Sequence, residues 1–229
     1  MFNVSNTELV HSSFYITYAF LMTTATITFI ESIRTKDAKI RNILNLETCI
    51  SVVAAFFYSK FVSMFESKSG YASTAAINYA QINYTRYLDW SITTPIMLLV
   101  LVLALLYNTK GGALNFFSFL IILLLNYGML GAGYLGEIQM MDKTMANSVG
   151  FLFFVGLYYY IYHNYVAKKY NFDNRILFFA FVFLWAIYGL VYFMNDVQKN
   201  VIFNVLDLLS KCFVGIFFWA YYTKVFTLS

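Results

Sequence analysis

Charged residues, prolines, cysteines and histidines are all scarce in this chain. Of its 229 residues, 11% are charged, one is proline, two are cysteine and two are histidine, whereas 61% are hydrophobic. A soluble domain carries about 25% charged residues, so this composition argues against a protein surrounded by water. Cys49 and Cys212 both lie in apolar runs. With so few histidines, the chain offers neither a disulfide framework nor a zinc site, and we expect no metal and no enzymatic activity.

Seven apolar segments make up most of the chain, each close to the roughly 20 residues that cross a bilayer as one helix. They run over residues 11–33, 42–63, 82–107, 114–136, 146–166, 175–195 and 201–223. We therefore expect an all-α, multi-pass integral membrane protein that forms one seven-helix transmembrane domain over residues 1–229, with the lipid bilayer around it. The net charge of +4 is small and falls in short loops, which argues against nucleic-acid binding.

Lysine and arginine are divided unequally between the two sets of loops. The richer set holds Arg34, Lys36, Lys39, Arg41, Lys110, Lys168, Lys169, Arg175 and Lys224, and the poorer set holds Lys68, Lys143 and Lys199. Cytoplasmic loops of membrane proteins are the basic ones. We therefore expect an extracellular N-terminus and a cytoplasmic C-terminus.

The last apolar segment carries a lysine near its centre. With a rise of about 1.5 Å per residue, Lys211 lies close to the midplane of the bilayer, where a charged amine costs at least ~3 kcal/mol. Asp207 precedes it by four residues and therefore lies one turn away on the same helix face. The pair indicates either a structural ion pair or a covalent site, because burial also favours the neutral, nucleophilic amine.

The third segment holds a second pair of charges, Arg86 and Asp89, three residues apart. Together with Lys211 and Asp207 they balance in sign. Such a set can stay ionised at low dielectric only where its members meet, so we expect one buried charge network. Pro95, the only proline, falls in the same segment and frees a backbone carbonyl there.

The third and last segments resemble those of the microbial (type 1) rhodopsins, through RYLDWSITTPIML and a D-x-x-x-K pattern, and the resemblance extends over all seven segments. The residues that carry it are Arg86, Asp89, Trp90, Thr93, Thr94 and Pro95 with Asp207 and Lys211. The stretch MLGAGYLG, residues 129–136, resembles the family's glycine-rich fourth helix. Gly189 and Tyr192 depart from the family, where a proline and a tryptophan are common. Within it, the sequence is most similar to rhodopsins of large algal viruses, and we expect it in their channelrhodopsin-like group I.

The resemblance implies that all-trans retinal is bound as a protonated Schiff base on Lys211, with Asp89 and Asp207 as counterions. It also implies a counterion network of Arg86, Thr93, Tyr58 and Tyr188. The implied retinal pocket consists of Trp90, Thr94, Met97, Met129, Gly133, Trp185 and Tyr192. For a viral protein this implies the host cell membrane as the location, and a homo-oligomer is compatible with the sequence.

The ion-transport function is less well defined by the sequence. Family proton pumps usually carry a carboxyl group eleven residues after the position of Asp89, but Val100 stands there. A carboxyl pair for extracellular proton release is also not evident, since only Asp196 occurs between the last two segments. The sequence therefore favours a light-gated cation channel, with Ser13, Glu47 and Asn204 along the ion path.

Two alternatives stay open. One is a light-driven outward proton pump in which Glu47 acts as an unusual proton donor, and the other is a sensory rhodopsin that signals to a partner protein. The transported partners would be inorganic cations or protons. Pumps for chloride or sodium replace a residue of the Asp89–Thr93 pair, and both residues are present here.

Overall fold

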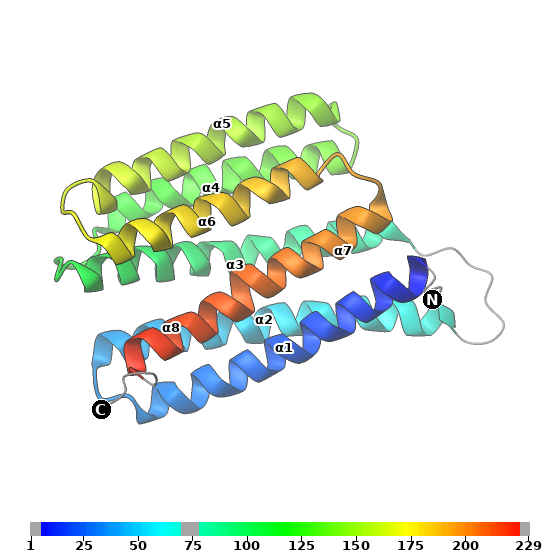
Figure 1. Ribbon diagram of the computed structural model, residues 1–229. Coiled ribbons are helices and arrows are strands. Elements are labelled where there is room, and N and C mark those ends of the chain that lie inside the picture. The colour runs from blue at the N-terminus through cyan, green and yellow to red at the C-terminus, as the bar shows by residue number, and fades with distance from the viewer. Residues whose placement is uncertain (1–5, 70–77, 225–229) are drawn as a thin grey trace.

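The structure is a computed structural model and describes residues 6–69 and 78–224. Within these ranges it contains helices and no strand (Figure 1). In chain order they are α1 (Asn6–Arg34), α2 (Ala38–Ser69), α3 (Tyr79–Asn108), α4 (Phe116–Glu137), α5 (Lys143–Ile161), η1 (Tyr162–Val166), α6 (Phe172–Val191), α7 (Asp196–Asp207), η2 (Leu208–Phe213) and α8 (Val214–Thr223). The two η segments are π-helices that continue α5 and α7.

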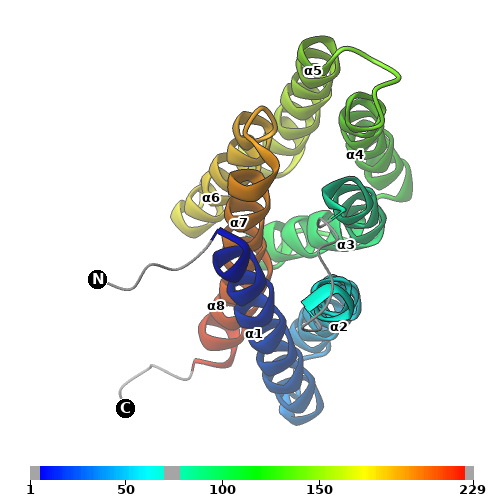
Figure 2. The same cartoon turned by 90° about the vertical axis from the view of Figure 1, so that its right-hand side faces the viewer.

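Seven helical segments of the described chain are long and apolar enough to cross a membrane, and α7, η2 and α8 together form the last of them. Each segment packs against the next, and the last returns to α1, so the helices form a closed ring. Figure 2 shows α1 and α2 at one side of the ring, α4 and α5 at the other, and α3 and α7 between them. The predicted all-α seven-helix bundle is confirmed.

The two ends of the bundle are named here by the course of α1. The N-terminal end holds the start of α1 and the connections from α4 to α5 and from α6 to α7 (Figure 1). The C-terminal end holds the end of α1, the connection from α3 to α4 and the end of α8. The functional side chains described below divide between these ends.

Asparagine and aspartate side chains begin five of the helices. In each case a side-chain oxygen just before the helix accepts a hydrogen bond from a backbone N–H of the first turn, which would otherwise lack a partner. The capping residues are Asn78, Asn115, Asp142, Asn171 and Asn195. The last span begins at Asp196 and not at residue 201 as predicted. Its first turn is polar, so hydropathy does not mark it, but the cap at Asn195 stabilises that turn as part of the helix.

The bundle is apolar on its outside and buries polar side chains among the apolar residues of its interior. Leu124, Leu152 and Phe183 are more than 60% exposed, whereas Thr17 and Thr24 are at most 2% exposed. An apolar surface with buried hydroxyl groups is the arrangement expected in lipid, where side-chain hydroxyls find partners between helices. The hydroxyls of Thr17 and Thr24 on α1 therefore point into the bundle.

Pro95 lies within α3, which continues without a break from Tyr79 to Asn108. A proline cannot donate to the carbonyl four residues before it, here that of Ser91. The Tyr127 hydroxyl on α4 donates to that carbonyl at 3.1 Å. A neighbouring helix thus satisfies the group that the proline leaves free, as a membrane interior requires.

Candidate functional site

Lys211 lies in the π-helical segment η2 and is 1% exposed. Its Nζ lies 2.7 Å from Asp89 Oδ2 on α3 and 3.4 Å from Asp207 Oδ2. Both aspartates are fully buried. A π-turn is rare and occurs often at functional sites, but the spacing of Asp207 and Lys211 predicts only an ordinary turn, so this irregularity was not foreseen.

The two aspartates differ in how well their oxygens are satisfied. Asp207 accepts hydrogen bonds from the hydroxyls of Tyr58 at 2.8 Å and Tyr188 at 2.6 Å, and Arg86 Nη1 lies 3.6 Å from its Oδ2. Asp89 Oδ1 is buried and has no hydrogen-bond partner among the described residues. Thr93 donates to the backbone carbonyl of Asp89 at 2.9 Å, and not to its carboxylate. Asp207 is therefore held as an anion from several sides, and Asp89 retains a free oxygen.

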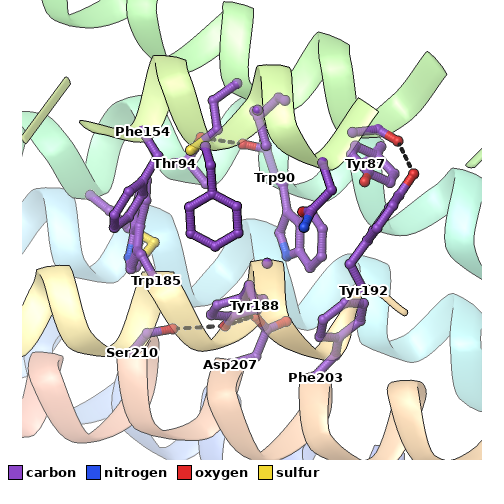
Figure 3. Close-up of a pocket in the computed structure, with 18 of the residues that line it drawn as sticks. Tyr87, Trp90, Thr94, Phe154, Trp185, Tyr188, Tyr192, Phe203, Asp207 and Ser210 are labelled. Carbon is purple, nitrogen blue, oxygen red and sulfur yellow. Dashed lines mark hydrogen bonds between the residues drawn. The ribbon is translucent and has the colours of Figure 1, made fainter. Parts of the chain in front are cut away.

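A cavity extends from Lys211 between α3, α4, α5 and α6 (Figure 3). Figure 3 shows Trp90, Trp185 and Tyr188 around it, with Asp207 and Ser210 on the side of the last span. All seven residues predicted for the retinal pocket line it, and its empty volume, including its open part, is about 800 Å³. The predicted pocket residues are Trp90, Thr94, Met97, Met129, Gly133, Trp185 and Tyr192.

Small residues and aromatic rings shape this cavity. A Cβ added at Gly133 would lie 2.7 Å from the Tyr87 hydroxyl, so a larger residue would shift that wall. Asn126 Nδ2 donates to Thr94 Oγ1 at 2.9 Å and fixes a second wall residue. The sequence did not single out Tyr87 or Asn126. The apolar walls with an amine at one end suit a long apolar aldehyde such as retinal.

Amide groups continue the network from Arg86 toward the N-terminal end of the bundle. Arg86 Nη2 donates to Asn204 Oδ1 at 2.8 Å and to Asn200 Oδ1 at 3.0 Å. Asn204 Nδ2 donates to Ser13 Oγ at 2.8 Å, and Tyr58 donates to Asn204 Oδ1 at 3.1 Å. Ser13 and Asn204, both predicted along an ion path, thus lie together but are bonded to each other and to the charge network.

A second charged cluster lies at the N-terminal end, and the sequence did not predict it. Lys199 Nζ lies 2.8 Å from Glu137 Oε1 and 3.1 Å from Asp196 Oδ1. Asn83 Nδ2 donates to the same two carboxylates, at 2.5 and 3.3 Å. Asp196 is the only carboxyl group between the last two segments of the sequence, but the end of α4 brings Glu137 close to it from 59 positions earlier in the chain.

Glu47 lies on the opposite side of Lys211, toward the C-terminal end, and is 2% exposed. It faces α8 at Gly215, one turn after Lys211, where an added Cβ would lie 3.1 Å from Glu47 Oε2 and 2.9 Å from Thr24 Cγ2. No hydrogen bond or ion pair joins its carboxyl group to another described residue. Glu47 therefore does not meet Ser13 and Asn204, with which it was predicted to line one path.

Comparisons with known proteins agree with this architecture. A sequence model of the "Bacteriorhodopsin-like protein" family matches residues 9–225. The crystal structure of viral rhodopsin OLPVRII is similar, with 56% sequence identity, a TM-score of 0.87, and coverage of 96% of this chain and 100% of that chain.

The names of two more distant relatives describe a light-absorbing protein and a light-driven pump. A green-light absorbing proteorhodopsin of Gamma-proteobacterium EBAC31A08 is 28% identical over 151 residues, or 58% of this chain, and the match spans only 59% of that protein's length. The crystal structure of the light-driven proton pump rhodopsin CsR of Coccomyxa subellipsoidea has a TM-score of 0.74 at 16% identity, with coverage of 93% of this chain and 96% of that chain. At that identity the likeness shows the fold alone.

Proposed function

The chain belongs to the bacteriorhodopsin-like protein family, and on this basis we propose that it is a light-driven pump that carries protons out of the cell. Membership makes it an integral, multi-pass membrane protein that binds retinal, in this family typically all-trans, and acts as a photoreceptor or ion transporter. The finer assignment to a proton pump is our proposal. Its direction assumes a cytoplasmic C-terminal end of the bundle, which the basic loops there favour.

Lys211 is the proposed attachment site, because its amine opens into the cavity and the chain around it is buried. Retinal held at the Lys211 nitrogen would supply the light absorption, and the residues around that nitrogen would hold and move its proton. The distances given above are those of the free lysine amine, which stands for the nitrogen of the loaded protein. Asp89 and Asp207 supply the negative charge that stabilises a proton on it.

Asp89 is the proposed acceptor of this proton. Its Oδ2 lies 2.7 Å from Lys211 Nζ, and its Oδ1 has no partner among the described residues. Asp207 is the worse acceptor, since two tyrosine hydroxyls and Arg86 stabilise its ionised form. The asymmetry gives the two carboxylates different roles, with Asp89 taking the proton and Asp207 remaining an anion.

Glu47 is the proposed donor that returns a proton to the Lys211 nitrogen. A buried carboxylate without a positive partner is costly, so the group is expected to hold its proton at rest. It lies one turn from Lys211 toward the C-terminal end of the bundle, on the side opposite Asp89. In this proposal Glu47 substitutes for a carboxyl group at Val100, which is buried in the apolar core.

A light-gated cation channel is the second candidate, and the buried hydroxyls of Thr17, Thr24 and Thr28 on α1 favour it. Arg86 argues against it, because a fixed positive charge repels cations in a pore. The guanidinium lies 5.1 Å from the ring centre of Phe61 and 5.5 Å from that of Phe203, so it is enclosed by aromatic rings. The geometry therefore supports a pump better than the channel that the sequence favoured.

The observation that carries the proposal is the position of Asp89 and Glu47 on opposite sides of Lys211. The test is to illuminate cells that express the retinal-loaded protein and to record the pH of the unbuffered medium. An outward pump acidifies the medium, and a protonophore abolishes the change. A channel or a sensor without an ion gradient leaves the pH unchanged, and alkalinisation would mean inward transport.

A further inference from the structure

The far side of the cavity from Lys211 carries three polar groups. Lys211 opens into the cavity from the last span, and α4 and α5 close the side away from it (Figure 2). Tyr87 on α3, Asn147 on α5 and Tyr192 after α6 all line the cavity there, whereas most of its other lining is apolar. A ligand attached at Lys211 therefore meets polar groups at its opposite end.

The two tyrosine hydroxyls meet at the backbone of Gly133 on α4. Tyr192 Oη donates to the Gly133 carbonyl at 2.9 Å, and Tyr87 Oη would lie 2.7 Å from a Cβ added at the same glycine. Figure 3 shows both tyrosines at one side of the cavity, away from Trp185. Because Gly133 has no side chain, both hydroxyls have room at the cavity wall.

Two of the three groups have no hydrogen-bond partner within the described part of the chain. These are the Tyr87 hydroxyl and the side-chain amide of Asn147. Tyr192 uses its proton on Gly133, but no described donor bonds to its oxygen, which can still accept. An unsubstituted hydrocarbon ring against this wall would remove water from these groups and leave them unpaired, which is unfavourable.

Gly189 on α6 lies beside the same groups. A Cβ added there would lie 3.6 Å from Asn147 Oδ1 and 2.6 Å from Phe151 Cε2, so the glycine lets α5 side chains approach α6 closely. Gly189 and Tyr192 are also the two positions at which the sequence departs from the proline and tryptophan common in the family. Both departures fall at this side of the cavity, so its shape and polarity differ from those that the resemblance implies.

We propose that this side of the cavity recognises a hydroxyl group on the ring of the chromophore, and that the protein binds a ring-hydroxylated all-trans retinal in preference to retinal itself. Retinal carries its aldehyde and its ring at opposite ends, so attachment at Lys211 directs the ring to the far side. Tyr87 and Asn147 can donate to a ligand oxygen, and Tyr192 Oη or Asn147 Oδ1 can accept its proton. The inference rests on the proposed attachment at Lys211 and is independent of the direction of transport.

The test lets equal amounts of all-trans retinal, 3-hydroxyretinal and 4-hydroxyretinal compete for a limiting quantity of the retinal-free protein. Hydroxylamine then releases the bound chromophores as oximes, which chromatography separates and quantifies. We expect one hydroxylated aldehyde to be bound about tenfold more than retinal, as one well-placed hydrogen bond provides. Equal amounts of the three, or a preference for retinal, would overturn the inference and mean that water satisfies the polar groups.

The variants N147L and Y87F should change the binding of the two kinds of ligand in opposite directions. Each removes an unpaired polar group without adding bulk, so retinal should bind at least as well as in the wild type. The hydroxylated aldehyde should lose most of its roughly tenfold preference. Equal weakening of both ligands would indicate only structural damage, and an unchanged preference in both variants would show that neither group recognises the hydroxyl; either result contradicts the inference.

Matched controls remove similar groups outside the cavity. S148A removes an exposed hydroxyl next to Asn147 that donates to the Thr144 carbonyl at 2.8 Å. Y134F removes the hydroxyl of a tyrosine whose ring centre lies 5.6 Å from that of Tyr87 but which is not among the residues lining the cavity. Both variants should keep the wild-type preference.

A second readout does not involve the bond to Lys211. The alcohols of retinal and of the preferred hydroxylated aldehyde cannot form that bond, and either one bound in the cavity should quench the fluorescence of Trp90 and Trp185, which line it. Titration should give about tenfold tighter binding of the hydroxylated alcohol in the wild type and equal binding in N147L/Y87F. Equal binding in the wild type overturns the inference. Failure of every aldehyde to form a pigment would instead overturn the attachment at Lys211, so the two failures are distinguishable.

Discussion

Lys211 Nζ and Asp89 Oδ2 lie 2.7 Å apart across the interface of η2 and α3, and the second oxygen of that aspartate has no hydrogen-bond partner among the described residues. The nitrogen thus has one neighbour that is already surrounded by donors, Asp207, and one that is not. This difference defines the direction of proton transfer, because Asp89 stabilises a proton that leaves Lys211 better than Asp207 does. The predictions below follow from it and from the place of Glu47.

Replacement of Lys211 by alanine should abolish the pigment, because no other amine opens into the cavity among the residues that line it. Visible absorption after addition of all-trans retinal to the purified variant measures this. The matched control is K60M, which should form the pigment normally. A K211A protein that still develops a stable visible band would place the attachment elsewhere.

The variants D89N and D207N should have different effects, the first on absorption and proton transport and the second on stability. D89N should form a pigment that absorbs at longer wavelength, because a negative charge near the nitrogen is gone, and it should not acidify the medium in light. D207N should be less stable, since Tyr58, Tyr188 and Arg86 all lose their anionic partner, and breaking a buried pair costs about 3–5 kcal/mol. Thermal bleaching of the two pigments compares them, and equal stability would contradict the asymmetry.

Glu47→Gln should slow the return of the proton to the Lys211 nitrogen without preventing its transfer to Asp89. Loss of a positioned proton donor typically costs a factor of about 10²–10⁴ in rate. Flash spectroscopy resolves the two steps, and a small diffusible weak acid should restore the slow one. E31Q is the control, because Glu31 lies near the end of α1 and pairs with Arg34 at 3.0 Å. If the decay in E47Q matches the wild type, Glu47 is not the donor.

Gly215→Ala should have a similar but milder effect. The added methyl would meet Thr24 Cγ2 at 2.9 Å and Glu47 Oε2 at 3.1 Å, so the carboxyl must move, and overpacking of this kind costs about 1–3 kcal/mol. The matched control is G131A, since a Cβ at Gly131 meets no atom within 4 Å. Reprotonation should slow in G215A only, and a change of equal size in both variants would assign the effect to general helix packing.

Much of the fold and of the inner site could be predicted because the signals are local. Runs of about 20 apolar residues define spans wherever they occur, and the four-residue spacing of Asp207 and Lys211 fixes their common face. The meeting of Asp89 with Lys211 across 122 positions followed from charge balance, since buried charges of opposite sign must pair.

The outer cluster could not be predicted, for a physical reason. Glu137 lies in the last turn of α4 and Asp196 in the first turn of α7, where polar residues are expected at the membrane surface and each one alone carries no signal. Only the packing of α3, α4 and α7 brings them to Lys199 and Asn83. The ion path along Ser13, Asn204 and Glu47 stays a prediction, because the sequence gives helix faces but neither the rotations nor the neighbours of the helices.

The most direct test of the central claim, that light drives protons outward between Glu47 and Asp89, is a series of photocurrents recorded at different membrane voltages with symmetric solutions. The account predicts an outward current that keeps its sign from negative to positive voltages and persists when all small inorganic cations except protons are replaced. A current that reverses sign near zero voltage and vanishes with those cations would contradict it and identify the protein as a channel.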